Sequence, residues 1–188
     1  MLSLSHIDAS WSLLLDRDGV INVEKDNDYI LHWNEFHFYP DSLEALAILA
    51  QIFPIICIVT NQKGVGRGLM TSAALAEIHT NMVTTIQHAG GRIDKIYYCT
   101  DIENDSPNRK PQPGMAFQAK ADFPIIDFSK TIMVGNRPSD MRFGRNAGVH
   151  TVYLNTTHPE TPVPHPDIDL RFENLLAFAQ ACAAAKKM

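Results

Sequence analysis

Two aspartates, Asp16 and Asp18, follow an apolar run and precede a glycine in the stretch SLLLDRDGVIN, residues 12–22. A carboxylate held at the end of a buried strand can attack an electrophile and form a covalent intermediate, as aspartyl-phosphate chemistry requires. A second carboxylate beside it can protonate a leaving oxygen and later activate water. The same four residues, Asp-Arg-Asp-Gly, also make an ordinary polar turn, so this stretch alone leaves both interpretations open.

Two further segments carry groups that phosphoryl transfer uses. In IVTNQKGVGRG, the hydroxyl of Thr60 and the backbone N–H of Asn61 can hold phosphoryl oxygens as negative charge develops on them. In NRKPQPGM, Lys110 lies between Arg109 and Pro111 and can neutralise a phosphorylated aspartate. A solvated surface lysine is the ordinary alternative for any single lysine, so the case for Lys110 depends on its neighbours in the fold.

A last segment, MVGNRPSDM, adds Asn136 and Asp140. Their side-chain oxygens, together with Asp16 and the carbonyl of Asp18, form a ligand set that suits Mg²⁺, which prefers oxygen ligands with few carboxylates and several waters. The sequence therefore predicts a magnesium site beside the two aspartates.

These residues need a sheet to bring them together, and the chain has the pattern of one. Short apolar segments alternate with helical patterns, which predicts βαβ units around a buried, mostly parallel sheet in an α/β fold. We expect strands over 12–15, 54–60, 94–99, 130–135 and 150–155. Ligands collect at the carboxyl ends of such strands, and the polar segments follow those ends.

Helices that cover the sheet are expected over 40–52, 71–91, 113–122, 138–148 and 172–187. Asp41 followed by Glu44 has the spacing of a capping box at the start of the first of these helices. The segment 22–39 lacks a continuous helical pattern and suits a short hairpin or loop over the sheet end. Residues 155–169 are too rich in proline for a helix or strand and should form a surface loop.

The composition indicates a single domain over residues 1–188 that acts on small molecules. The chain is 45% hydrophobic and 20% charged, with a net charge of -5, which is unlike a basic nucleic-acid-binding protein. There is no basic, apolar leader and no run long enough to span a membrane, so we expect a cytoplasmic protein without an obligate protein partner. Three cysteines without a CxxC pair predict reduced, buried thiols.

The motifs DRDGVIN, TNQKGVGRG, RKPQPGM and VGNRPSDM, in this order, resemble those of the haloacid dehalogenase (HAD) superfamily over roughly residues 12 to 155. Within it, they are most similar to the phosphatases of D-glycero-D-manno-heptose 1,7-bisphosphate and of histidinol phosphate. The resemblance implies a three-layer, Rossmann-like fold without a cap domain. It also implies roles for single residues: Asp16 as nucleophile, Asp18 as general acid and base, Thr60 and Lys110 as phosphoryl stabilisers, Asn61, Gln62, Arg109 and Arg137 as substrate contacts, and Asp16, Asp18 and Asn136 as Mg²⁺ ligands.

The chain departs from the family pattern at two places. Asn136 stands where the family usually has Asp, and an amide oxygen contributes no negative charge, so we predict weaker Mg²⁺ binding. Many relatives hold the loop after the third strand with a zinc site of Cys and His, whereas CTDIENDSPNRK keeps only Cys99, with Asp101 at the His position. One thiolate does not make a four-ligand site, so we predict that zinc is absent.

Three functions remain open at this point. The resemblance implies removal of the 7-phosphate from a heptose 1,7-bisphosphate, and Arg109 and Arg137 favour it because guanidinium groups match the geometry of a second phosphate. Histidinol phosphate or another small sugar phosphate is the alternative substrate, since the acidic ENDSP segment could favour a cationic amine. Asn136 motivates a different class, a non-catalytic domain that binds a phosphorylated ligand or a partner protein.

Overall fold

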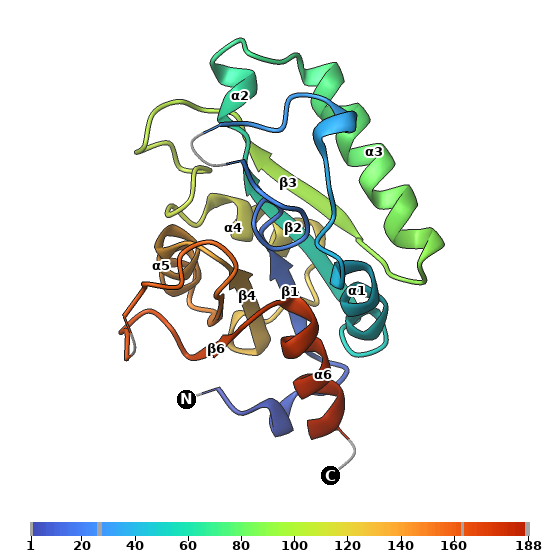
Figure 1. Ribbon diagram of the computed structural model, residues 1–188. Helices are drawn as coiled ribbons and strands as arrows, with labels where there is room; N and C mark the ends of the chain where they lie inside the picture. Colours follow the sequence, from blue (N-terminus) through green and yellow to red (C-terminus); the bar gives the residue numbers. More distant parts are fainter. Residues whose placement is uncertain (1, 26–27, 163, 187–188) are drawn as a thin grey trace.

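A six-stranded parallel sheet forms the centre of the protein in a computed structural model that describes residues 2–25, 28–162 and 164–186 (Figure 1). The strand order is β3-β2-β1-β4-β5-β6, and every neighbouring pair is parallel. The strands are β1 (Ser12–Leu15), β2 (Ile55–Asn61), β3 (Lys95–Cys99), β4 (Thr131–Gly135), β5 (His150–Leu154) and β6 (Leu170–Phe172).

The inner strands are apolar along their length because both faces of the sheet are covered. In β1, Leu14 packs into the core on one face, whereas Leu13 and Leu15 pack into the core on the other. All three side chains are fully buried. The three leucines before Asp16 therefore place that residue at the end of a rigid, central strand.

Two layers of helices cover the sheet (Figure 1). Helices α1, α3 and α6 pack together on one face, and α4 and α5 pack on the other, against β2, β3, β4 and β5. The helices are α1 (Ser42–Ala50), α2 (Lys63–Gly66), α3 (Ser72–His88), α4 (Gly114–Asp122), α5 (Pro138–Ala147) and α6 (Leu175–Ala185), with short 3-10 helices at Leu4–His6, Trp33–Glu35 and Phe128–Lys130. This is the three-layer, Rossmann-like α/β architecture that the sequence predicts.

Two local expectations were wrong. The final helix does not start at Phe172, because that residue lies in β6, pairs with Leu154 of β5 and precedes the helix cap Asn174. Asp41 makes no side-chain capping bond, since the hydroxyl of Ser42 instead donates to the carbonyl of Tyr39 at this helix start. The short helix α2 and strand β6 were not expected.

The remaining segments are loops, as the sequence indicates. Within the described part of 22–39, the chain forms the 3-10 helix at Trp33–Glu35 and isolated bridges of Asn22 with Asp18 and Phe38. The described residues of 155–169 form turns and bends, and Val163, predicted to lie in this loop, is outside the described residues. The first of these loops crosses the sheet near the carboxyl end of β1.

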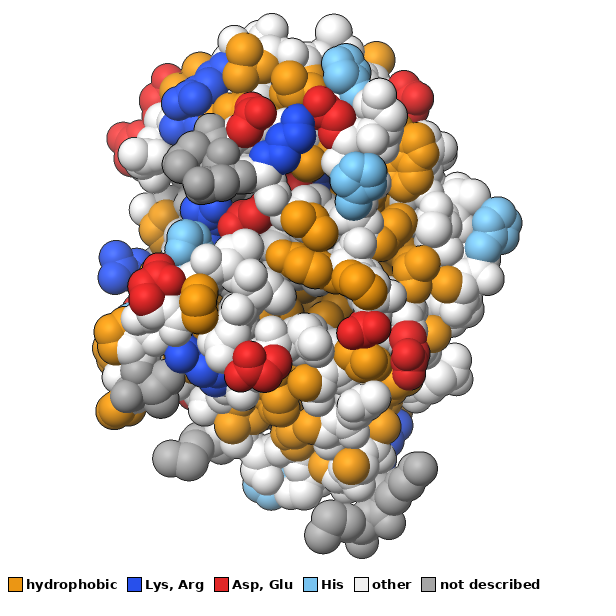
Figure 2. All heavy atoms as spheres, in the orientation of Figure 1, with side chains coloured by type: hydrophobic (Ala, Val, Ile, Leu, Met, Phe, Trp, Pro, Cys, Tyr) orange, Lys and Arg blue, Asp and Glu red, His pale blue; other side chains and the backbone are white. Residues whose placement is uncertain are grey.

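The surface is mixed in character. Figure 2 shows charged side chains of both signs interspersed with apolar ones over the face seen in Figure 1. Cys57, Cys99 and Cys182 are free and buried, which confirms the prediction for the thiols. None of the helices that the structure describes is long and apolar enough to cross a lipid bilayer.

The sheet order creates a crevice at β1. Because β1 pairs with β2 on one side and β4 on the other, chain connections run in opposite directions from this strand. A strand from which the connections run in opposite directions marks a topological switch point of the sheet. The loops at the carboxyl ends of its neighbouring strands diverge there and leave room for a ligand. The polar segments after β1, β2 and β4 meet here.

Candidate active site

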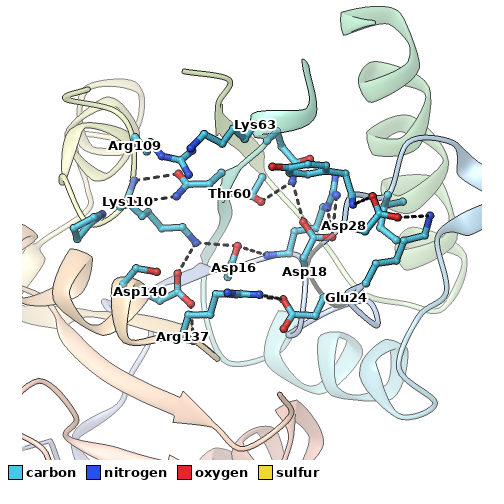
Figure 3. A pocket seen from close by; sticks show the side chains of 18 of the residues that line it. Asp16, Asp18, Glu24, Asp28, Thr60, Lys63, Arg109, Lys110, Arg137 and Asp140 are labelled. Carbon is cyan, nitrogen blue, oxygen red and sulfur yellow. Dashed lines mark hydrogen bonds and ion pairs between the residues drawn. The ribbon is translucent and has the colours of Figure 1, made fainter. Parts of the chain in front are cut away.

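A cavity of about 600 Å³ opens at the carboxyl ends of the strands (Figure 3). Its volume falls in the range of small-molecule sites. Of the residues singled out in the sequence, its lining includes Asp16, Asp18, Thr60, Asn61, Gln62, Arg109, Lys110, Arg137 and Asp140. Asn136 does not line the cavity and is fully buried.

Asp16 and Lys110 form a buried ion pair at the floor of the cavity. The ammonium of Lys110 lies 2.9 Å from Asp16 Oδ1, which also accepts a 2.7 Å hydrogen bond from the backbone N–H of Arg17. Burial and the neighbouring Asp140 carboxylate raise the pKa of Asp16 to about 7, although Lys110 acts in the opposite direction. Burial alone would lower the pKa of Lys110, but the Asp140 and Asp16 carboxylates raise it above its usual value, so the ammonium stays charged.

Asp140 connects this lysine to the start of helix α5. Its Oδ1 lies 2.7 Å from the Lys110 ammonium, and its Oδ2 accepts from the backbone N–H groups of Asn136, at 3.2 Å, and Arg137, at 3.0 Å. Free N–H groups at a helix start favour a carboxylate there. A side chain on Gly135 would overlap Asp140, so glycine at the end of β4 is needed for this approach.

Asn61 and Lys110 are joined through the backbone. Asn61 Oδ1 accepts from the Lys110 N–H at 3.0 Å, and Asn61 Nδ2 donates to the Lys110 carbonyl at 3.1 Å. This pair of bonds ties the loop after β3 to the end of β2. The side chain of Asn61 therefore fixes the position of Lys110.

Asp18 lies beside Asp16 in a cage of hydrogen-bond donors. Arg17 donates to Asp18 Oδ1 from Nε, at 3.2 Å, and from Nη2, at 2.9 Å, and Asn22 Nδ2 donates to the same oxygen at 2.9 Å. Gln62 Nε2 donates to Asp18 Oδ2 and to the Thr60 hydroxyl, both at 2.9 Å. Burial alone would raise the pKa of Asp18, but Arg17, Asn22 and Gln62 lower it below its usual value.

The residues around Asn136 fit a magnesium ion. Asn136 Nδ2 donates to the Thr157 hydroxyl at 2.5 Å, whereas Asn136 Oδ1 is buried without a hydrogen-bond partner among the residues the structure describes. Gly19, whose φ is +83°, packs so closely on this amide that a side chain there would overlap it. A buried side-chain oxygen without a hydrogen-bond partner, packed on the Gly19 turn that follows Asp18, has a lone pair available for a metal ion.

The charge of the buried cluster also favours a cation. Three carboxylates, Asp16, Asp18 and Asp140, face two cationic side chains, Arg17 and Lys110. The difference leaves one net negative charge in the cluster, and the Asp140 and Asp18 carboxylates add to burial, the largest cause, in raising the pKa of Asp16. A bound divalent cation would reverse this imbalance.

Cationic side chains form one side of the cavity. Lys63, Arg67 and Arg109 all line it, and partial burial together with the Arg109 and Arg67 guanidinium groups lowers the pKa of Lys63. Figure 3 shows the Lys63 and Arg109 side chains next to each other above Thr60. Arg137, by contrast, forms a 2.9 Å ion pair with Glu24 on the opposite side.

Sequence reasoning missed several of these residues. Arg17 and Asn22 lie within the opening motif, yet a hydrophilic loop residue gives no sign that it will be buried against Asp18. Lys63 and Glu24 are ordinary charged residues by type, and only the fold places them at the cavity. The GVGRG segment after Lys63, which contains Arg67, is the one sequence signal that could have indicated a tight turn near the ligand.

The chain is similar in sequence to proteins named as heptose bisphosphate phosphatases. It is 31% identical over 177 residues to D-glycero-alpha-D-manno-heptose-1,7-bisphosphate 7-phosphatase of Mycobacterium tuberculosis, which covers 94% of this chain and 93% of the relative. It is 34% identical over 172 residues to the corresponding beta-specific protein of Pseudomonas aeruginosa, over 90% of this chain and 96% of the relative. Residues 107–166 match a family model described as "HAD-hyrolase-like".

The fold is similar to a solved structure of the same kind. The D,D-heptose 1,7-bisphosphate phosphatase from B. bronchiseptica, solved with magnesium and phosphate, superposes with a TM-score of 0.83 and 28% identity. The match covers 92% of this chain and 98% of that one. The agreement therefore extends over nearly the whole chain.

Proposed function

The chain belongs to the family of heptose-1,7-bisphosphate 7-phosphatases among the HAD-like hydrolases, and we propose that Asp16 carries its reaction as a phosphoryl-aspartate. The substrate is D-glycero-D-manno-heptose 1,7-bisphosphate, from which the enzyme removes the 7-phosphate. The observation that carries this proposal is the buried Asp16–Lys110–Asp140 cluster at the floor of the cavity. It supplies a nucleophile with a fixed cation beside it.

In the first half-reaction, Asp16 attacks the phosphorus of the 7-phosphate. Lys110 and the Arg17 N–H fix Asp16 Oδ1, so we assign the attack to Oδ2. The new bond joins Asp16 Oδ2 to phosphorus, and the bond from phosphorus to the sugar oxygen breaks. Asp18 must enter this step protonated, and it gives its proton to the sugar oxygen and becomes ionised. Thr60 accepts a hydrogen bond from Gln62, which leaves its own O–H free to donate to a phosphoryl oxygen.

In the second half-reaction, water attacks the phosphoryl-aspartate. Asp18 takes a proton from the water, whose oxygen bonds to phosphorus as the bond to Asp16 breaks and phosphate leaves. The contacts from Arg17, Asn22 and Gln62 lower the pKa of Asp18, and its ionised form is the one that accepts this proton. The general acid of the first step thus returns as the general base of the second.

Asp16, the carbonyl of Asp18 and Asn136 Oδ1 are the groups we propose for Mg²⁺. When bound, the ion would neutralise charge on the transferring phosphoryl group. Asp140 was predicted as a further ligand, but both of its oxygens contact Lys110 and the α5 backbone, which favours a role in holding Lys110. Compared with the Asp that is usual at this position in the family, Asn136 offers a side-chain oxygen without a negative charge. Weaker magnesium affinity therefore stays our prediction.

Lys63, Arg67 and Arg109 are the groups we propose for the second phosphate of the substrate. They line the cavity close enough together for Arg109 and Arg67 to lower the pKa of Lys63, and Lys63 and Arg67 are not in an ion pair with any residue the structure describes. For Arg109 we retain the prediction of a contact with substrate. We propose the same role for Arg137, although its ion pair with Glu24 offsets much of its charge.

Phosphate release tests the proposal. Wild-type protein would be assayed with both anomers of heptose 1,7-bisphosphate, histidinol phosphate and sugar monophosphates, with and without Mg²⁺, next to Asp16→Asn. We expect release that needs Mg²⁺, prefers the heptose bisphosphate and is lost in the variant. Equal release by Asp16→Asn, or none from folded wild-type protein, would refute the mechanism, and a preference for histidinol phosphate would refute the substrate.

Several sequence predictions belong to the same proposal. We propose a cytoplasmic enzyme that is one domain over residues 1–188, works without zinc, and needs neither nucleic acid, a membrane nor an obligate protein partner. Metal analysis of the purified protein tests the zinc prediction, and stoichiometric zinc would contradict it.

A further inference from the structure

We propose that Arg17 and His79 are positioning residues that fix the orientation of the Asp18 carboxylate for proton transfer. The inference rests on the proposed function, because it concerns the step in which Asp18 protonates the leaving oxygen. Neither residue was singled out in the sequence. Arg17 touches Asp18 directly, whereas His79 acts through Arg17 and does not line the cavity.

The side chain of Arg17 is buried. The residue is 1% exposed, and its guanidinium contacts Asp18 Oδ1, His79 Nε2 and the face of Phe36, whose ring centroid lies 5.8 Å from Arg17 Cζ. A buried cation is costly unless its environment compensates for lost water. The burial of the Arg17 guanidinium therefore indicates that its contact with Asp18 serves the site, and we infer that it holds the Asp18 carboxylate in place.

His79 supports the far end of this guanidinium from helix α3. Its Nε2 lies 3.2 Å from Arg17 Nη1, and because a guanidinium can only donate, Nε2 must be the acceptor and the ring proton must be on Nδ1. Burial and the Arg17 charge lower the pKa of His79 to about 3, so the ring is neutral. The ring also packs against Tyr98 of β3, with centroids 5.6 Å apart.

Together with Asn22 and Gln62, the two residues hold the Asp18 carboxylate in a single orientation. Asp18 Oδ1 accepts from Arg17 and Asn22, and Oδ2 accepts from Gln62. Asn22 and Gln62 come from loops, while His79 belongs to a helix whose inner face is buried. Loss of the His79 acceptor would free the guanidinium, and through it the carboxylate that must lie in line with the leaving oxygen.

The leaving group provides a specific readout. The sugar oxygen at C7 is an alkoxide when it departs and needs the proton of Asp18, whereas p-nitrophenolate is stable without one. The kcat/KM value reports on the reaction up to the first irreversible step, which includes departure of the leaving group. A misplaced Asp18 should therefore lower kcat/KM for the sugar phosphate and leave that for p-nitrophenyl phosphate nearly unchanged.

The test compares two variants at the same position with a control on the same helix. His79→Leu keeps a similar volume and removes the acceptor, whereas His79→Gln keeps an acceptor. Ile78→Val trims a fully buried neighbour whose side chain has no group that can hydrogen-bond Arg17. For His79→Leu we expect kcat/KM for heptose 1,7-bisphosphate to fall about 10-fold, a part of what general acid catalysis supplies, with p-nitrophenyl phosphate unchanged. His79→Gln and Ile78→Val should keep the wild-type ratio of the two substrates.

Equal losses with both substrates, or the same selective loss in Ile78→Val, would overturn the inference, because His79 would then be only a packing residue. Absence of turnover in the wild type is a different result and refutes the proposed function itself. A second measurement does not depend on turnover: ¹⁵N spectra of the imidazole at neutral pH should place the proton on Nδ1 of His79. A proton on Nε2 would exclude the contact with Arg17 and overturn the inference.

Discussion

Replacement of the nucleophile should stabilise the metal-free protein. In the folded state, burial and Asp140 raise the pKa of Asp16 from 3.8 to about 7, whereas in the unfolded chain it keeps its ordinary value. A carboxyl group whose pKa is raised by folding contributes stability that is present at low pH and is lost as pH rises toward the folded pKa. Asn has no proton to lose, so Asp16→Asn should escape this loss.

The size of the effect follows from the same two values. Each pH unit between them lowers the free energy of unfolding of the wild type by roughly 1 kcal/mol relative to the variant, so the difference should grow from roughly 1 kcal/mol at pH 5 to a few kcal/mol at pH 8. Urea unfolding in EDTA, followed by tryptophan fluorescence across this pH range, measures the difference. Addition of Mg²⁺ should stabilise the wild type and have little effect on the variant.

Asp18→Asn is the matched control, with the same chemical change two residues away. Arg17, Asn22 and Gln62 lower the pKa of Asp18, so its carboxylate contributes stability above the ordinary pKa and this variant should be less stable than the wild type at pH 8. Opposite signs for the two variants are the expected result. A destabilised Asp16→Asn at pH 8, or a difference that does not grow with pH, would refute the charge imbalance inferred for the cluster.

Three further predictions follow from the site. Asn136→Asp adds a negative charge to the proposed metal site, so Mg²⁺ binding measured by calorimetry should tighten about tenfold. The same change should lower the stability of the metal-free protein because the Glu24 carboxylate lies nearby. Unchanged affinity would exclude Asn136 as a ligand. Lys63→Met should raise KM for the bisphosphate about tenfold but not for a monophosphate, with the distant exposed Lys130→Met as control; a parallel rise for both substrates would refute the second-phosphate site. EDTA should abolish turnover and excess Mg²⁺ should restore it, so activity that survives EDTA would contradict the metal assignment.

The sequence predicted the parts of the molecule that repeat a simple pattern. The five apolar strands and the helices between them follow from periodicity, and the polar residues after β1, β2 and β4 converge because parallel strands end at one edge. In α3, for example, the buried face includes Leu75, Ile78, Met82 and Ile86, which recur in the sequence at helical spacing.

What the sequence did not reveal depends on contacts between distant positions. Strand β6 is three residues long and gains its place only by pairing with β5. His79 and Arg17 are 62 residues apart, and neither type predicts burial. The Asn61 side chain bonds the Lys110 backbone across two loops, and spacing in the sequence does not reveal such a partner.

The central claim is a covalent phosphoryl-aspartate at Asp16, and its detection is the most direct test. Wild-type enzyme with Mg²⁺ and heptose 1,7-bisphosphate would be quenched in acid within one turnover, digested, and analysed by peptide mass spectrometry. We expect a phosphoryl group on the Asp16 side chain that is absent from Asp16→Asn. An active enzyme without this adduct at any quench time, or with the phosphoryl group on another residue, would contradict it.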